Sequence, residues 1–415
     1  MTRNDFLAAF RSVLDHVDPE RAAADAVRTE NGAVVVGDAT FDGFEGVPVV
    51  VALGKAACAM ARGVSSVVGP VRGIAVSDHE EPAPVEVIVG GHPIPDERSL
   101  EAGRRMLDVV RSVGPDELVI FCISGGGSAV AEVPAGGVGL DDVAALNTAL
   151  IAGGLPIEEI NEVRASISDI KGGRLARACR SKHRVTLVLS DVVGAGPEAV
   201  ASGPTLGFGL GEVSDEAMNQ IRSSGGVPEP VFDAIAGSVP AEATEPQRFV
   251  VLGSPVTSAG QAAAALTERG IGARLWTSSL SGDVEPAVMG MIERVEDARN
   301  SVAAVVATGE VTVRVAGSGV GGRNQHAAVL AAKAIRGTDL VFGAFGTDGR
   351  DGPTDAAGAI VDGGSADRMR RNGIDIDEAI RTFDSYAALA ASGDLVTTGP
   401  TGTNVADVWM AGRTA

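Results

Sequence analysis

Residues 118–130, LVIFCISGGGSAV, restrict what this chain can fold into more than any other segment. The apolar run has the length of a buried strand and is too short for a typical helix. It ends in consecutive glycines, whose backbone can adopt conformations that a Cβ forbids and can approach a ligand closely. Hydroxyl side chains flank the glycines. The loop consists of Ser124, Gly125, Gly126, Gly127 and Ser128. A strand ending in such a loop is typical of a phosphate-binding turn, and a tight turn with nothing bound fits these residues equally well.

Segments of strand character alternate with segments of helix character along the chain. Buried strands are predicted at residues 47–53, 118–123 and 185–189, and a helix at 99–113 with Ser99 as its N-cap. Because strands and helices alternate, the sequence predicts an α/β fold with a largely parallel sheet that is buried on both faces.

The length of 415 residues exceeds what one hydrophobic core usually supports, so two domains are expected. The segment 206–247 contains several glycines, prolines and acids, and a second α/β series follows it. We therefore assign residues 1–235 to the first domain and 236–415 to the second, with the option that the final residues pack back on the first. The polar loops are expected to face each other across a cleft between the domains, which would hold the active site.

Composition argues against several classes of function. A net charge of −20 disfavours nucleic acid as a partner, and no apolar run is long enough to span a membrane. The N-terminal segment has the pattern of an amphipathic helix rather than of a signal peptide. Cys58, Cys122 and Cys179 are scattered in apolar contexts without metal-binding spacing. They predict reduced, buried thiols in a cytoplasmic protein.

Two charged residues come directly after predicted strands, where open parallel sheets bind their ligands. Lys55 follows the strand at 47–53, and Asp191 follows the strand at 185–189. A lysine there could neutralise a transferring phosphoryl group, and a carboxylate could hold Mg²⁺ or accept a proton from an attacking hydroxyl. The alternatives are a solvated surface lysine and an Asx turn.

A second polar cluster lies in residues 161–174, NEVRASISDIKGGR. Asn161 and Arg164 share one helix face, and Arg164 could bind a carboxylate through two parallel hydrogen bonds. A solvated helix that ends at a glycine C-cap also fits this pattern.

Residues 317–322, GSGVGG, match G-x-G-x-x-G, and Asp348 follows the next predicted strand, where a ribose-binding acid would stand. This match supports an NAD(P)-linked reductase as a rival hypothesis. Arg323 follows at the start of a predicted helix, where a guanidinium favours an anion. The sequence contains no Walker A motif, which excludes a P-loop kinase, and no G-x-S-x-G motif, which disfavours a nucleophilic hydrolase.

The chain resembles the glycerate 2-kinase family over nearly its whole length. The resemblance rests on motifs that occur in order, among them ALGKAA at 52–57, GGHPIPDE at 90–97, ISGGGSA at 123–129, GGRNQ at 321–325 and GTDGRDGPTDAAGA at 346–359. The family joins a Rossmann-like N-terminal domain to a C-terminal MOFRL domain. The resemblance implies ATP-dependent phosphorylation of D-glycerate to 2-phosphoglycerate, with a divalent cation.

The resemblance also implies roles for individual residues. The functional lysine of the family falls on Lys55, its functional arginine on Arg323, and its phosphate loop on residues 124–128. Asp191 is our candidate for Mg²⁺ or for the base, and Asn161, Arg164 and Asp348 are our candidates for substrate binding. The sequence departs from the family pattern at His326, where an acid commonly follows GGRNQ, so the electrostatics beside Arg323 are open to question.

We therefore expect a cytoplasmic kinase that uses ATP and Mg²⁺, with D-glycerate as its substrate and neither nucleic acid nor membrane as a partner. A hydroxypyruvate reductase that uses NAD(P)H, a kinase for a related small sugar acid, and a non-catalytic phosphate-binding protein remain alternatives. The sequence leaves monomer and homodimer open. We also expect replacement of Lys55 or Arg323 by alanine to abolish turnover and to leave the fold intact.

The charge pattern predicts adaptation to high salt. The chain carries 54 acidic and 34 basic residues, and lysine occurs only at positions 55, 171, 182 and 333. Salt screens the repulsion among excess acids, so we expect the thermal unfolding temperature to rise as NaCl increases from low to molar concentration. A matched series with sucrose separates screening from solvent exclusion. Unfolding induced by molar NaCl would contradict a halophilic origin.

Overall fold

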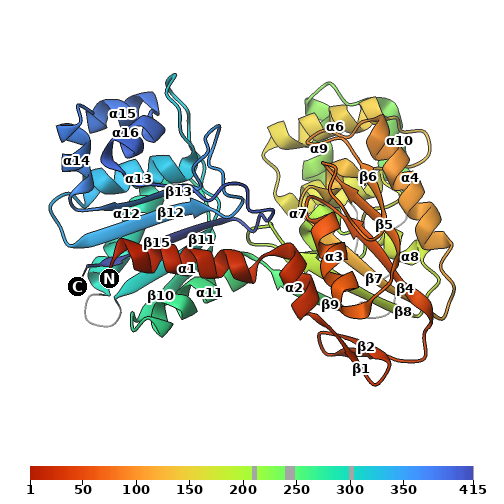
Figure 1. Ribbon diagram of the computed structural model, residues 1–415. Coiled ribbons are helices and arrows are strands. Elements are labelled where there is room, and N and C mark those ends of the chain that lie inside the picture. The colour runs from red at the N-terminus through yellow and green to blue at the C-terminus, as the bar shows by residue number, and fades with distance from the viewer. Residues whose placement is uncertain (208–212, 239–247, 299–302, 415) are drawn as a thin grey trace. The chain divides into compact units, whose positions relative to one another are not determined.

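The computed structural model describes residues 1–207, 213–238, 248–298 and 303–414, and it divides into two compact units (Figure 1). One unit comprises Pro19–Leu252, and the other combines Met1–Asp18 with Gly253–Ala415. The first domain was predicted to span residues 1–235, whereas the corresponding unit begins at Pro19 and ends at Leu252. Parts of the predicted softer segment, residues 208–212 and 239–247, lie outside the described residues. Both units are α/β structures, so the predicted fold class is confirmed.

The unit Pro19–Leu252 contains a six-stranded sheet in the order β6-β5-β4-β7-β8-β9. The strands are β4 Glu45–Leu53, β5 Arg72–Ser77, β6 Glu86–Val89, β7 Glu117–Ser124, β8 His183–Leu189 and β9 Phe249–Gly253, the last of which ends one residue into the other unit. The pairs β4–β5, β4–β7, β5–β6 and β7–β8 are all parallel, which confirms the predicted parallel sheet. The centre of β4 and β7 is buried, as their continuous apolar runs require.

Helices and a small meander complete this unit. The helices that accompany the sheet are α2 Pro19–Asp25, α3 Ala57–Val68, α4 Glu97–Arg111, α5 Gly127–Val130, α8 Arg174–Ala178 and the 3₁₀ helix η1 Pro197–Ser202. A separate apolar cluster joins α6 Leu140–Gly153, α7 Ile157–Ser166, α9 Asp215–Ser223 and α10 Glu229–Gly237. The strands β1 Val27–Glu30, β2 Ala33–Val36 and β3 Ala39–Phe41 form an antiparallel sheet of their own.

Helix α4 begins two residues before the predicted start, because Asp96 rather than Ser99 is its N-cap. The Asp96 carboxylate accepts hydrogen bonds from the backbone N–H groups of Arg98 at 3.0 Å and Ser99 at 3.2 Å. The Ser99 hydroxyl in turn accepts one from the Asp96 backbone N–H at 3.1 Å. The two residues therefore form a reciprocal capping box, in which Ser99 occupies the third helical position.

The other unit contains a mixed six-stranded sheet in the order β10-β11-β15-β12-β13-β14. The strands are β10 Ala273–Leu280, β11 Ala304–Gly309, β12 Leu340–Gly346, β13 Gly358–Asp362, β14 Leu395–Val396 and β15 Asp407–Arg413. Only β10 and β11 pair in parallel, and the other neighbours pair antiparallel. The last strand, β15, lies between β11 and β12. The final strand thus belongs to this sheet.

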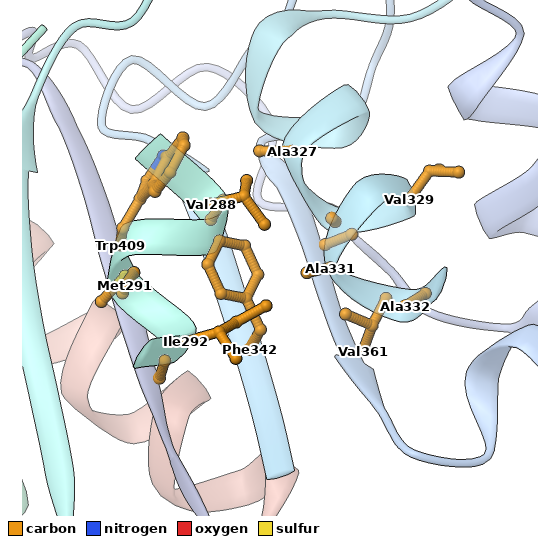
Figure 2. Close-up of a cluster of buried hydrophobic side chains, with 14 of the residues drawn as sticks. Val288, Met291, Ile292, Ala327, Val329, Ala331, Ala332, Phe342, Val361 and Trp409 are labelled. Atoms are coloured by element: carbon orange, nitrogen blue, oxygen red, sulfur yellow. The ribbon is translucent and has the colours of Figure 1, made fainter. Parts of the chain in front are cut away.

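Helices cover both faces of the mixed sheet. They are α1 Arg3–His16, α11 Pro255–Glu268, α12 Val284–Asp297, α13 Arg323–Ala334, α14 Ser365–Arg371, α15 Ile376–Thr382 and α16 Ser385–Ser392. On one face, Phe342 of β12 contacts Trp409 of β15 edge to face, with ring centroids 5.4 Å apart. Apolar residues of α12 and α13 enclose this pair, including Val288, Met291 and Ala331 (Figure 2).

The opposite face of the same strand explains why the N-terminal helix belongs to this unit. Side chains alternate between the faces of a strand, so Phe345 lies on the face opposite Phe342. Phe10 of α1 stacks on Phe345 with ring centroids 4.4 Å apart, and Phe6 lies against Gly343. Both aromatic residues of α1 are fully buried. The amphipathic pattern predicted this helix but could not say which sheet its apolar face would cover.

Two expectations from composition can be compared with this structure. Cys58, Cys122 and Cys179 are buried free thiols, as predicted. Among the helices that the structure describes, none is long and apolar enough to cross a membrane.

Candidate active site

The carboxyl ends of β4, β7 and β8 bring Lys55, the Gly/Ser loop and Asp191 together. A Cβ placed on Gly125 would lie 2.0 Å from Oδ2 of Asp191, and one on Gly126 would lie 3.0 Å from Cγ of Lys55. The backbone N–H of Lys55 donates to the carbonyl of Gly125 at 2.9 Å. The side chains of Lys55 and Asp191 therefore both lie directly against the glycine backbone, and a Cβ on Gly125 would overlap the Asp191 carboxylate.

The two serines of the loop contribute structure. Ser124 is buried, and its hydroxyl accepts from the backbone N–H of Ala56 at 3.1 Å and donates to the carbonyl of Leu53 at 3.3 Å. These bonds hold the turn that carries Lys55. Ser128 shares a hydrogen bond of 2.8 Å with the hydroxyl of Ser202.

Asn161 is connected to the loop through the same hydroxyl. Ser202 donates to Oδ1 of Asn161 at 2.9 Å, and Nδ2 of Asn161 donates to the carbonyl of Ala199 at 3.2 Å. Asn161 is buried, and these two bonds position η1 beside the loop. Both amide groups of Asn161 are therefore bonded to other residues of the protein.

Two residues that the sequence analysis did not select also lie near Lys55. Asp78 follows β5, and His92 lies in the loop after β6. Burial works to raise the pKa of Asp78, but the hydrogen bond from His79 and the nearby charges of His79, Lys55 and His92 outweigh it and lower that pKa. Partial desolvation and the charge of Lys55 lower the pKa of His92. The sequence signal that could have identified Asp78 and His92 is their position just after two predicted strands.

A cavity of about 230 Å³ lies beside the loop in the same unit. Its walls come from the Pro93–Pro95 segment, from α6 and α7, and from Ser128 and Ala129 of α5. Arg164 of α7 lines it, and Nε of Arg164 donates to Oδ1 of Asn147 at 2.7 Å. Burial lowers the pKa of Arg164, and the negative charge of Glu132 opposes this shift.

Glu132 and Lys171 form a buried ion pair in the wall of this cavity, and each side chain is 3% exposed. Nζ of Lys171 donates to Oε2 of Glu132. The other carboxylate oxygen accepts from the Ser168 hydroxyl at 2.6 Å and from the Val133 backbone N–H at 3.0 Å. Burial lowers the pKa of Lys171, and Glu132 opposes this shift. Glu132 carried no sequence signal, because it lies in no recognisable motif.

In the other unit, Arg323 stands at the start of α13 between two carboxylates. Its Nε and Nη2 donate to the two oxygens of Asp407 at 2.6 and 3.1 Å, and its Nη1 donates to Glu310. Burial disfavours the charge of Arg323, but the bonds to Asp407 and the charge of Glu310 outweigh it and raise its pKa. Asp407 is buried, so removal of Arg323 would leave a buried charge unpaired. The expectation that Arg323→Ala leaves the fold intact is therefore revised: this change should also destabilise the protein.

Asp351 satisfies the N-terminal N–H groups of α13. Its carboxylate accepts from the backbone of Asn324 at 3.1 Å and of Gln325 at 2.7 Å. Burial raises the pKa of Asp351 to about 7 in spite of these two bonds. Asp348, by contrast, is exposed and accepts a hydrogen bond from the backbone N–H of Arg350 at 3.0 Å in a local turn.

The segment 317–322 does not have the geometry of a dinucleotide fingerprint. That fingerprint requires a strand directly before the glycines, whereas β11 ends at Gly309 and no strand covers 310–322. Cβ atoms on Gly317 and Gly319 would lie 2.3 Å from the carbonyl oxygen of Thr382 and 2.5 Å from the backbone nitrogen of Asp384. These glycines serve the close packing of two chain segments, so the motif match was misleading.

His326 does not place a charge beside Arg323. Its ring stacks on Phe383 at 4.3 Å, and Nδ1 lies 3.2 Å from the Ser385 hydroxyl. Burial lowers the pKa of His326 to about 4, so the ring is neutral near pH 7. The residue is part of the contact between α13 and the segment that leads into α16.

The site has no preformed metal cage. In the part of the chain that the structure describes, no group of three or more His, Cys, Asp or Glu side chains is arranged to hold a metal ion. Mg²⁺ that arrives with a nucleotide needs only one or two protein carboxylates in addition to phosphate oxygens and water. Asp191, whose carboxylate lies against the loop, fits that requirement.

Two family models match the chain in sequence order. Residues 5–224 match a domain of unknown function, DUF4147, and residues 303–407 match the MOFRL family. The chain therefore belongs to the class of two-domain α/β proteins that combine DUF4147 with MOFRL. In this class a parallel sheet with polar loops at its carboxyl ends is joined in one chain to a MOFRL unit.

Relatives with established names share this organisation over most of their length. A glycerate 2-kinase of Pyrococcus horikoshii is 36% identical over 95% of this chain and 93% of its own. A D-glycerate 2-kinase of Thermotoga maritima is 37% identical over 87% of this chain and 89% of its own. The crystal structure of a glycerate kinase from the same organism superposes with a TM-score of 0.88, 34% identity and 99% coverage of both chains. The chain belongs to the glycerate 2-kinase family.

The pKa of His326 generates a prediction about stability and pH. Because it is lowered from 6.5 to about 4, neutral His326 contributes stability that is fully present above pH 6.5 and is lost as the pH falls towards 4. The loss should reach about 3 kcal/mol, since one pKa unit corresponds to about 1.4 kcal/mol. Urea unfolding at several pH values should show a shallower pH dependence for His326→Gln than for the unchanged protein.

The exposed His16 offers a matched control, because His16→Gln should leave the pH dependence unchanged. An identical pH dependence in His326→Gln and the unchanged protein would show that His326 is not the titrating group.

Proposed function

We propose that this protein transfers the γ-phosphoryl group of ATP to the 2-hydroxyl of D-glycerate, which yields 2-phosphoglycerate and ADP. The observation that carries the proposal is the glycine loop after β7, which has Lys55 against one glycine and Asp191 against the next. Such a loop lets backbone groups approach phosphate closely while a cation and a carboxylate flank it. Relatives named glycerate 2-kinase at 36–37% identity supply the substrate.

In this proposal Lys55 neutralises charge that develops on the transferring phosphoryl group. The lysine is exposed at the strand end, and its aliphatic chain lies along Gly126, which directs the side chain over the loop. The oxygen of the substrate hydroxyl forms the new bond to phosphorus, and the bond to the β,γ-bridging oxygen breaks, so that ADP leaves. Preorganised charge of this kind typically contributes about 10²–10³ in rate per group.

Asp191 is proposed as the carboxylate that holds Mg²⁺ or takes up the proton of the attacking hydroxyl. The cation, when bound, would neutralise phosphate charge. Both duties require an ionised carboxylate beside the loop, and the contact between Asp191 and Gly125 supports that position.

Arg164 is proposed to bind the carboxylate of glycerate. Its cavity also contains Ser128, so a ligand held there would lie next to the phosphate loop. Asn161 then acts through Ser202 and Ser128 as part of the support of the loop. Arg323 keeps its proposed role as a cation on the strength of the family resemblance, and Asp348 stays our own candidate for substrate binding.

A hydroxypyruvate reductase is the second candidate, because relatives in Agrobacterium vitis at 37% identity carry that name as a provisional designation. The absence of a strand before residues 317–322, within the described part of the chain, weighs against a dinucleotide site there. A kinase for a related sugar acid would use the same residues and differ only in its substrate.

Replacement of Lys55 tests the proposal directly. Release of ADP from Mg-ATP and D-glycerate should fall by about 10²–10³ in Lys55→Ala, because the phosphoryl charge loses its cation. Lys182→Ala, at an exposed ion pair with Asp116, is the matched control and should keep full activity. NADH with hydroxypyruvate is the reductase arm, and phosphorus NMR of the product identifies the phosphorylated carbon. Near-normal turnover of Lys55→Ala would remove Lys55 from the mechanism, and NADH oxidation without ADP release would favour the reductase.

The contact between Gly125 and Asp191 generates a second prediction. A Cβ at residue 125 would lie 2.0 Å from the Asp191 carboxylate and must displace it. We expect kcat/KM of Gly125→Ala to fall on the order of 10²-fold, since misplacement of a reacting group by about 1 Å can cost that much. Steady-state kinetics measure the effect.

Gly136→Ala is the matched control for this change. Gly136 is exposed, and a Cβ there would meet no atom within 4 Å. Full activity in Gly125→Ala as well as in Gly136→Ala would remove Asp191 from the proposed site.

A further inference from the structure

The Glu132–Lys171 ion pair takes no part in the proposed phosphoryl transfer, yet it lines the same cavity as Arg164. Both side chains are almost fully buried, and both carboxylate oxygens of Glu132 accept hydrogen bonds, one from Lys171 and the other from Ser168 and Val133. Isolated charges are rarely buried at this depth, because their desolvation must be offset by a partner. The pair therefore calls for an explanation in terms of its neighbour Arg164.

Arg164 differs from the pair in that it lacks a carboxylate partner. Its Nε donates a hydrogen bond to Asn147, and within the described residues its two Nη groups make no hydrogen bond. The charges of Lys171 and Glu132 cancel, whichever of the two holds the shared proton. The cavity consequently retains one net positive charge, that of Arg164, which matches a ligand with one carboxylate.

Glu132 is the natural competitor for that guanidinium. Glu132, Arg164 and Lys171 line the same cavity, and the negative charge of Glu132 opposes the lowering of the pKa of Arg164 by burial. An unshared buried carboxylate beside a buried guanidinium would bind it strongly, because attraction between charges rises as the surroundings become less polar. In the structure the ion-pair partner of Glu132 is Lys171 instead.

We propose that Lys171 is a positioning residue, which holds Glu132 and thereby leaves the guanidinium of Arg164 to bind the carboxylate of a small 2-hydroxy monocarboxylate in this cavity. The proposal rests on the proposed function for the identity of the ligand, D-glycerate. It explains why a lysine that is paired with Glu132 is buried in the wall of this cavity. It also predicts that the damage caused by loss of Lys171 can be repaired at Glu132.

The test is a pair of variants compared by steady-state kinetics with D-glycerate. In Lys171→Met, Glu132 is free to pair with Arg164, so KM for D-glycerate should rise at least about tenfold while kcat at saturation changes little. In Lys171→Met/Glu132→Gln, the competing charge is gone and the amide oxygen can still accept from Ser168 and Val133. KM should then return to within about threefold of the original value. Lys182→Met, at an exposed ion pair, is the matched control and should leave both constants unchanged.

Three results would overturn the proposal: an unchanged KM in Lys171→Met, a double variant with a KM as high as that of the single one, or a tenfold higher KM in Glu132→Gln alone. Circular dichroism and urea unfolding show whether Lys171→Met folds. If it does not, Glu132→Gln alone still tests the proposal, because a tenfold higher KM in that variant would contradict it. Failure of the proposed function would look different, because the unchanged protein would then release no ADP with D-glycerate. Calorimetric binding of D-glycerate to the same variants then tests the role of Lys171 without turnover.

Discussion

The parallel pairing of β4, β7 and β8 is the constraint on which the candidate site depends. Val51 lies opposite Phe121, and Phe121 lies opposite Thr186, so the three strands end at the same edge of the sheet. Their continuous apolar runs require burial on both faces, which fixes this register and leaves polar side chains only where the strands stop. Lys55, the glycine loop and Asp191 converge for that reason, although long stretches of chain separate them.

Buried charge decides which cations of this protein are available to a ligand. Arg323 is committed to Asp407 and Glu310. Lys171 is likewise committed to Glu132, and both pairs offset a desolvation cost that neither partner could bear alone. Arg164, which lines a cavity, has no carboxylate partner among the residues that the structure describes. Motif positions alone would rank Arg323, Lys171 and Arg164 alike. Their partners differ, because carboxylates of the protein hold Arg323 and Lys171, whereas a ligand carboxylate would meet no such competitor at Arg164.

Much of the site was predictable because the signals were local. A strand that ends in glycine, lysine or aspartate can be recognised from a few consecutive residues, and the structure brings the predicted Lys55, Gly125, Gly126 and Asp191 together. The match at 317–322 failed for the same reason: the glycine spacing is local, whereas the preceding strand that would give it meaning is absent from the described fold. Glu132 was not predictable, since nothing in its neighbourhood in the sequence indicates a buried partner 39 residues away.

The sequence by itself determined the α/β class, the strand ends that carry polar residues, and the family. Each of these follows from short-range patterns of apolar residues and glycines, or from motifs in order along the chain. Only the tertiary structure decided that α1 packs through Phe10 on Phe345, that β15 lies in the middle of its sheet, and which charges are paired. An amphipathic face or a charged side chain requires a partner, but the partner is selected by contacts between distant segments, which a local pattern cannot specify.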